Sequence, residues 1–88
     1  MTDDDRWQRL RETLDRLHAW PGPYTFKFVV PSARVPEVRE AVGDLSFTER
    51  SSSNGRYVSL TATVQAGAVD EVLDVYRAIE DIPGVVSL

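Results

Sequence analysis

Three segments of the chain alternate hydrophobic and polar residues with the period of two that is typical of β-strands. Residues 57–66 show this most clearly, because Val, Leu and Ala occupy one face while Tyr, Ser, Thr and Gln occupy the other. Residues 24–30 alternate in the same way, and residues 45–50 and 85–88 predict two shorter strands. One hydrophobic face per strand predicts an antiparallel sheet with one buried side and one polar side.

Three other segments repeat hydrophobic residues at the helical period of three to four. Residues 35–42 predict a short helix that ends at Gly43, and residues 68–80 predict a long one. Residues 5–18 predict the first helix of the chain, with a stripe that consists of Trp7, Leu10, Leu14 and Leu17. This stripe predicts a docking surface, and the pattern leaves open whether the rest of the chain or a second copy covers it.

After residue 20 the order of elements is strand, helix, strand, strand, helix, strand. This order predicts an α+β, ferredoxin-like βαββαβ sandwich, in which two helices cover one face of a four-stranded antiparallel sheet. Right-handed crossovers place the strands at residues 24–30 and 56–66 in the centre. We therefore expect a ferredoxin-like domain over residues 21–88 and an extra N-terminal helix within residues 1–20.

The hairpin between the second and third strands is the candidate binding site. Asn54-Gly55 predicts a type I′ turn, because both residues tolerate positive φ. Three serines, exposed backbone N–H groups and two flanking arginines suit a small anion or a carboxylate. The alternative is that Ser, Asn and Gly only satisfy the chemistry of the turn. The candidate ligand- or partner-binding residues are Arg50, Ser53, Asn54, Gly55, Arg56, Tyr57 and Lys27.

Composition narrows the function mainly by exclusion. The 88 residues carry a net charge of −4, no cysteine and a single histidine, His18. This excludes cysteine nucleophiles, disulfides and paired-histidine metal sites within the chain, so we expect no enzymatic activity, no cofactor and no metal. We expect His18 to be an exposed histidine at a helix end. No apolar run approaches the ~20 residues that span a bilayer, and the acidic N-terminus is unlike a signal peptide, so we expect a cytoplasmic protein.

The C-terminal quarter supplies the whole net charge. Its acidity argues against nucleic acid and against anionic membranes as partners. No spacing in it matches a calcium loop, so we expect a solvated helix face rather than a cation site. The acidic residues concerned are Asp70, Glu71, Asp74, Glu80 and Asp81.

Three segments resemble the YbeD-like family of small bacterial proteins of unknown function. Residues 51–61 (SSSNGRYVSLT) are similar to the family's hairpin, and residues 24–32 (YTFKFVVPS) to its first strand. Residues 69–86 are similar to its closing helix and strand, so the resemblance covers roughly residues 20–88. It implies a ferredoxin-like fold akin to ACT-type regulatory domains, and it brings a loose label of lipoic-acid-binding regulatory protein. The family has no agreed catalytic residues to carry over.

These observations predict a small non-enzymatic regulatory or interaction module of ACT-like architecture. We expect it to bind a protein partner or a small anionic metabolite, as a monomer or a weak homodimer. The alternative is an accessory protein that binds lipoate or another acyl acid. That alternative requires an apolar slot that ends in a cation, and the candidate cations are Lys27 and Arg50.

Overall fold

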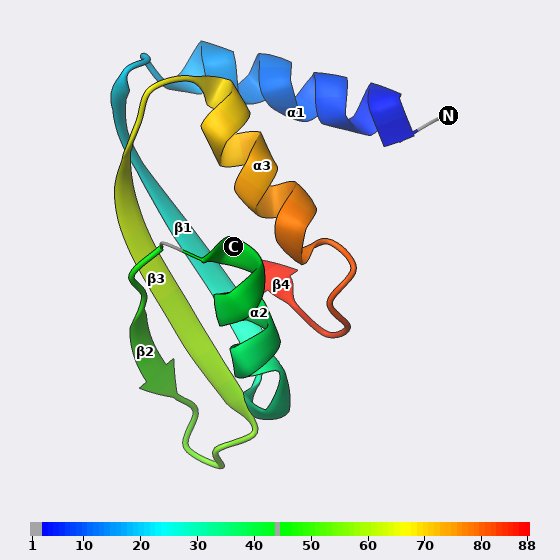
Figure 1. Ribbon diagram of the computed structural model, residues 1–88, viewed down its shortest axis with the longest axis vertical. Helices are drawn as coiled ribbons and strands as arrows, with labels where there is room; N and C mark the ends of the chain where they lie inside the picture. The colour runs from blue at the N-terminus through cyan, green and yellow to red at the C-terminus, as the bar shows by residue number, and fades with distance from the viewer. Residues whose placement is uncertain (1–2, 44) are drawn as a thin grey trace.

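The computed structural model describes residues 3–43 and 45–88, and the order of its elements is the predicted one. The first half of the chain forms α1 (Asp3–Leu17), β1 (Gly22–Pro31), the 3₁₀ turn η1 (Ser32–Arg34) and α2 (Val35–Val42). The second half forms β2 (Thr48–Ser51), β3 (Tyr57–Ala66), α3 (Val69–Ile79) and β4 (Val86–Ser87) (Figure 1).

The four strands form one antiparallel sheet in the order β2-β3-β1-β4. β1 and β3 pair over their whole length, from Gly22 opposite Ala66 to Pro31 opposite Tyr57, so the two strands predicted to be central are central. At the edges, β2 pairs with β3 over residues 48–51, whereas β4 pairs with β1 only over residues 86–87. The α+β, ferredoxin-like arrangement is confirmed.

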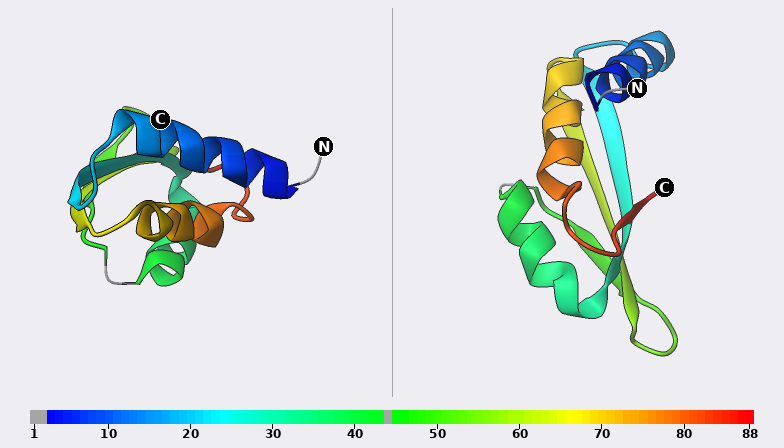
Figure 2. Two further views of the ribbon diagram at one scale, coloured as in Figure 1. Left: turned by 90° about the horizontal axis from the view of Figure 1, so that it is seen from above. Right: turned by 90° about the vertical axis from the view of Figure 1, so that its right-hand side faces the viewer.

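α2 and α3 lie on the same face of the sheet, and no helix of the described chain covers the opposite face (Figure 2). The core fills the space between these two layers. Its least accessible large side chains include Phe26, Phe28, Leu60, Val72 and Leu73. They occupy the positions that the strand alternation and the helical period predict to face inward. Removing this apolar surface from water is the main free-energy gain of folding.

α1 packs against α3 of the same chain, which answers the question that the sequence left open (Figure 1). Leu14 is the buried member of the stripe, with 5% of its surface exposed. Trp7 and Leu10 are partly buried against the core. Leu17, at the end of the helix, is 68% exposed. The stripe is therefore covered within this chain over most of its length.

The acidic face of α3 is partly used to hold α1, contrary to the expectation that it is only solvated. Arg6 of α1 forms an ion pair with Glu80, with a nitrogen–oxygen distance of 2.5 Å. Arg11 forms a second ion pair with Asp70. The hydrogen bond from Arg11 lowers the pKa of the Asp70 carboxyl, and the same bond raises the pKa of the guanidinium. These contacts join residues that are far apart in the sequence, so no local sequence pattern predicts them.

β2 and β4 are shorter than the alternation predicts. The strand expected over residues 45–50 pairs only over residues 48–51, and the one expected over residues 85–88 only over residues 86–87. Leu45 and Phe47 still pack against the core, although their backbone lies outside the ladder. Alternation thus identified the inward side chains correctly but overestimated how far the backbone pairs.

The hairpin turn also differs from the predicted type. Gly55 has a φ of 72°, but no non-glycine residue in the described part of the chain has a positive φ, so Asn54 does not adopt the type I′ conformation. The Gly55 N–H donates to the Ser52 carbonyl at 3.0 Å, which places Ser53 and Asn54 at the centre of the turn. A left-handed residue after the turn is typical of longer hairpin loops.

Candidate functional site

The hairpin uses many of its polar groups internally. The side-chain oxygen of Asn54 accepts hydrogen bonds from the Ser52 hydroxyl at 2.9 Å and from the Arg56 N–H at 3.0 Å. The Tyr57 N–H donates to the Ser52 hydroxyl oxygen at 3.1 Å, and the Gly55 N–H is bonded across the turn. The backbone N–H groups of Gly55, Arg56 and Tyr57, which we expected to face an anion, are thus bonded within the loop and are not available to a ligand.

The predicted binding residues do not form one cluster. Ser53, Asn54 and Gly55 lie in the loop, whereas Lys27 and Arg50 lie on the helix-free face of the sheet. On that face Lys27 is opposite Thr61 of β3, and Arg50 is opposite Ser59, the next outward position along the strand. Two strand spacings and one two-residue step separate their Cα atoms by about 12 Å. The binding role of these residues stays a prediction.

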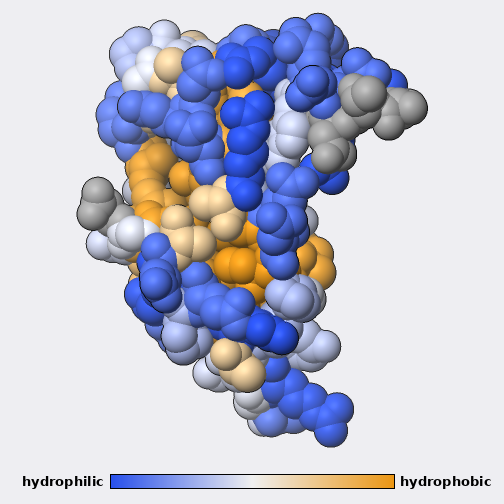
Figure 3. Space-filling view, turned by 45° about the vertical axis from the view of Figure 1, so that its right-hand side comes forward, coloured by the Kyte–Doolittle hydropathy of each residue, from blue (hydrophilic) through white to orange (hydrophobic). Residues whose placement is uncertain are grey.

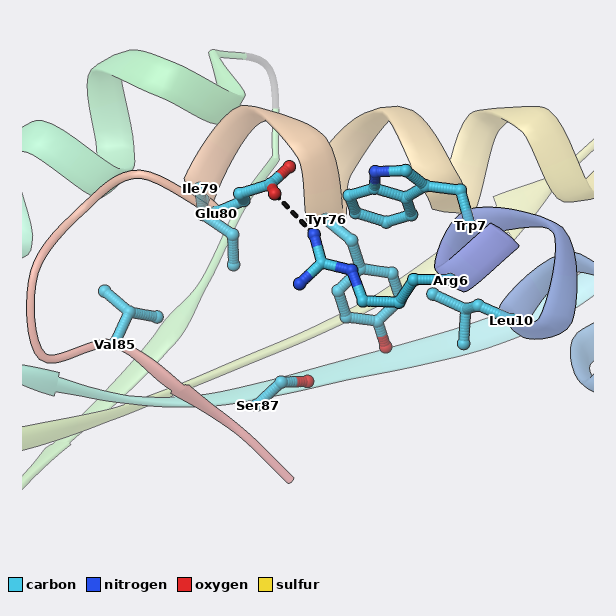
Figure 4. A pocket seen from close by; sticks show the side chains of 8 residues that line it. All are labelled: Arg6, Trp7, Leu10, Tyr76, Ile79, Glu80, Val85 and Ser87. Atoms are coloured by element: carbon cyan, nitrogen blue, oxygen red, sulfur yellow. Dashed lines mark hydrogen bonds and ion pairs between the residues drawn. The ribbon is translucent and has the colours of Figure 1, made fainter. Parts of the chain in front are cut away.

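A groove of about 400 Å³ lies at the other end of the molecule, between α1, α3 and β4. Figure 3 shows hydrophobic surface gathered in the hollow below α1, with hydrophilic surface around it. The lining residues are Arg6, Trp7 and Leu10 of α1, Tyr76, Ile79 and Glu80 at the end of α3, and Val85 and Ser87 in and beside β4 (Figure 4). The volume lies within the range of about 300–1,000 Å³ typical of small-molecule sites.

The local structure explains why this space is left unfilled. β4 pairs with β1 only at Phe28 and Val29, so it covers a small part of the edge of β1. Ser87 is opposite Phe28, which places its short side chain on the helix side of the sheet. α1 closes the upper side of the hollow through Trp7 and Leu10 (Figure 4). A small polar residue at a position that faces the core layer therefore leaves room beneath the helix.

The rim of the groove carries opposite charges. Arg6 extends across the opening and binds Glu80 at 2.5 Å, as the dashed line in Figure 4 shows. The guanidinium carbons of Arg6 and Arg77 each lie 5.0 Å from the centre of the Trp7 ring. Cation–π contacts of this kind attract a guanidinium to the face of an indole. They help to fix Trp7 as one wall of the groove.

The floor of the groove is part of an aromatic cluster. The Tyr76 ring contacts Phe26 and Phe28 at 5.4 and 6.0 Å between ring centres. Its hydroxyl lies 2.7 Å from that of Tyr24. Burial, reinforced by the hydrogen bond to Tyr76, raises the pKa of Tyr24 above its usual range. One of these two neutral hydroxyls donates the hydrogen bond between them, and the other keeps a proton that it can donate to a different acceptor.

Two sequence signals point toward this groove, although neither of them alone predicts it. Trp7 and Leu10 belong to the stripe of the first helix, which predicted a docking surface. Ser87 is a polar residue at an inward position of the last strand, where the alternation expects a hydrophobic one. What the sequence could not supply is the crossing of α1 over α3, which brings these signals to one place.

The single histidine and the described acidic residues do not form a metal site. His18 is half-buried, with its ring centre 5.0 Å from that of Tyr24 and 5.6 Å from that of Trp20, so the expectation of an exposed histidine was wrong. Within residues 3–43 and 45–88, no three His, Cys, Asp or Glu side chains are grouped so that they could hold a metal. No helix in the same residues is long and apolar enough to cross a membrane.

Comparison with known proteins gives a family but no activity. Residues 15–88 match the family described as "Protein of unknown function (DUF493)". The chain is 30% identical over 82 residues to a UPF0250 protein of Citrobacter koseri, an alignment that covers 83% of this chain and 92% of the relative. The UPF0250 proteins YbeD of Salmonella arizonae and Salmonella newport match with the same identity and coverage. No solved structure matches the chain.

Proposed function

This chain belongs to the YbeD-like family of proteins of unknown function (DUF493, UPF0250), and we propose that it is a small non-enzymatic regulatory module that binds an amphipathic anionic metabolite. The binding site is the groove between α1, α3 and β4. The observation that carries this proposal is a hollow of about 400 Å³ with apolar walls and a guanidinium at its rim.

The apolar walls suit the hydrocarbon part of such a ligand. Trp7 and Leu10 of α1, Ile79 of α3 and Val85 just before β4 line the groove. Transfer of apolar ligand surface into such a site contributes about 25 cal/mol for each Å² removed from water. The hydroxyls of Tyr76 and Ser87 add a few polar groups, which small-molecule sites use to fix orientation.

Arg6 is the cation that would meet the anionic group. A guanidinium has five N–H donors, and the ion pair with Glu80 at 2.5 Å uses only part of this capacity. A ligand carboxylate can therefore bind beside Glu80 without displacing it. Arg6 is more than half exposed, so this contact adds specificity rather than much affinity.

A second candidate function is that of an accessory protein for lipoate or another acyl acid. The specific observation in its favour is the combination of an apolar slot with a cation, which such a ligand requires. The cation differs from the expected ones, because Lys27 and Arg50 lie on the helix-free face of the sheet whereas Arg6 lines the groove. Arg6 therefore replaces them in this hypothesis.

The two tryptophans provide an internal control for the test. Trp7 lines the groove, whereas the indole N–H of Trp20 donates to Asp15 at 2.8 Å, outside it. We expect millimolar octanoate to shift the Trp7 indole signal in the spectrum of ¹⁵N-labelled protein and to leave the Trp20 signal in place. Lipoate in a parallel titration tests the second candidate, since binding at least tenfold tighter than octanoate is required for a dedicated lipoate site.

Groove-directed variants make the assignment sharper. Ser87→Leu fills the groove and should abolish the octanoate shift, whereas Ser46→Leu adds the same side chain at an exposed position before β2 and should not. Arg6→Gln should weaken binding by up to about fivefold, the upper limit for an exposed ion pair. An unchanged Trp7 signal at millimolar octanoate and lipoate, or a Ser87→Leu protein that binds as well as the native one, would rule out the groove as the binding site.

A further inference from the structure

We infer that the helix-free face of the sheet is a docking surface for an acidic helix of a partner protein. This surface is made of the outward residues of the four strands and is separate from the groove. Its members are Pro23, Thr25, Lys27, Val29 and Pro31 of β1, Thr48 and Arg50 of β2, Tyr57, Ser59, Thr61, Thr63 and Gln65 of β3, and Val86 of β4.

The charge of this face is opposite to that of the molecule. The chain has a net charge of −4, yet the outward strand residues include two cations, Lys27 and Arg50, and no Asp or Glu. Glu49 belongs to β2, but its register opposite Leu60 places it on the helix side, where it pairs with Arg39 of α2. The described acidic side chains thus lie on α1, α2, α3 and the helix side of β2, or in the turn that follows α3.

The cations of this face also lack internal partners. Five arginines elsewhere in the described chain form ion pairs with carboxylates, and they are Arg6, Arg11, Arg34, Arg39 and Arg77. In the same residues no carboxylate lies within ion-pair distance of Lys27 or Arg50. Their charges are therefore available to carboxylates that a partner brings.

The layout of the face fits a helix. The Cα atoms of Lys27 and Arg50 are about 12 Å apart. Two acidic residues seven positions apart on one helix face are about 10.5 Å apart, because an α-helix rises 1.5 Å per residue. Ser59 and Thr61 of β3 lie between the two cations. The row of Arg50 and Ser59 continues through Val29 to Val86, which lies on β4 and is 52% exposed. These two valines offer a small apolar patch to the helix beside its Lys27 end.

A protein helix fits this face better than nucleic acid does. Two cations neutralise few phosphates, and the acidic helices of the same molecule repel an extended polyanion. Among the outward residues only Tyr57 is aromatic, whereas single-stranded nucleic acid is held by several stacked bases. The outward hydroxyl groups of Ser59, Thr61 and Thr63 on β3 suit the polar side chains that flank the apolar face of a helix. A helix is also the element that ordinarily covers an open sheet face.

The test compares two synthetic alanine–glutamine helices of equal charge. Each carries two glutamates, placed seven residues apart in one peptide and four apart in the other. Titration into ¹⁵N-labelled full-length protein at low salt should shift the amides of Lys27, Ser59 and Arg50. The seven-residue spacing should bind about two- to fivefold tighter, which is the range for one exposed ion pair gained.

Variants of single cations distinguish binding at a specific site from nonspecific electrostatic attraction. Lys27→Gln and Arg50→Gln should each weaken the matched peptide by up to about fivefold and make the two peptides equivalent. Arg16→Gln removes the same charge from the exposed end of α1 and should preserve the preference. The inference fails if the native protein does not distinguish the two spacings, or if a short oligonucleotide competes at equal concentration. It also fails if these amides shift with protein concentration alone, because a second copy would then cover the face.

Discussion

Replacing Leu14 with alanine tests whether α1 is an integral part of the fold. Leu14 is the buried anchor of this helix, with 5% of its surface exposed. Buried Leu→Ala substitutions cost about 2–5 kcal/mol, and the cost is smallest where the surroundings can close the cavity. α1 lies at the surface and can settle toward α3, so we expect a loss of about 2–3 kcal/mol in the free energy of unfolding.

Leu17 provides the matched control, because it is on the same helix but 68% exposed. Leu17→Ala should change the free energy of unfolding by less than about 0.5 kcal/mol, as is usual for surface positions. Urea denaturation followed by circular dichroism measures both values. Hydrogen exchange of the α1 amides shows whether Leu14→Ala also releases the helix locally, which would expose Trp7 and weaken ligand binding in the groove. Equal effects of the two substitutions would contradict the docking of α1 on α3.

Three further predictions concern single residues. Arg11 lowers the pKa of Asp70 below its ordinary value of 3.8. The ion pair therefore stabilises α1 fully above pH 3.8, and this stabilisation is lost as the pH falls through the lowered pKa of the folded protein. Protection of the α1 amides, measured by hydrogen exchange in acid, should show this loss in the native protein and not in Asp70→Asn. Tyr24→Phe leaves the hydroxyl of Tyr76 without its partner and should lower the free energy of unfolding, measured by thermal denaturation, by about 0.5–1.5 kcal/mol. An unchanged stability would mean that a water molecule replaces the lost hydrogen bond. Gly55→Ala should cost about 1–2 kcal/mol, because Gly55 has a φ of 72°, and Gly55→Asn should cost less, which denaturation of the two variants compares directly.

The core and the order of elements could be predicted because each depends on local periodicity. Phe26 and Phe28 of β1, and Val58 and Leu60 of β3, occupy alternate positions and all of them are buried. A shift of one residue in either strand would move these side chains to the open face, so burial and register specify each other. The same reasoning identified the outward position of Lys27, which pairs opposite Thr61.

The groove could not be predicted because it depends on contacts between distant parts of the chain. Arg6 and Glu80 are 74 positions apart, and their ion pair joins α1 to the end of α3. Helical periodicity shows that Trp7 lies on the hydrophobic face of α1, but it does not show which surface that face contacts. The hairpin illustrates the opposite error, because Ser52 and Asn54 have the residue types of a binding loop but bond to each other. Residue type alone does not distinguish a donor that is available from one that is already used.

The two proposed surfaces lie on opposite sides of one sheet, and β4 is the element through which they can influence each other. Val86 belongs to the helix-free face, whereas the next residue, Ser87, lines the groove. This strand is held to β1 by its pairing opposite Phe28 and Val29 and by the bond from the Leu88 N–H to the Lys27 carbonyl, so few bonds resist its displacement. The remaining strands are anchored by longer ladders or by the core. A ligand that moves Ser87 should therefore change the position of Val86, and any effect of one binding event on the affinity of the other must be reciprocal. Absence of a shift at the Val86 amide on filling the groove would mean that the two surfaces act independently.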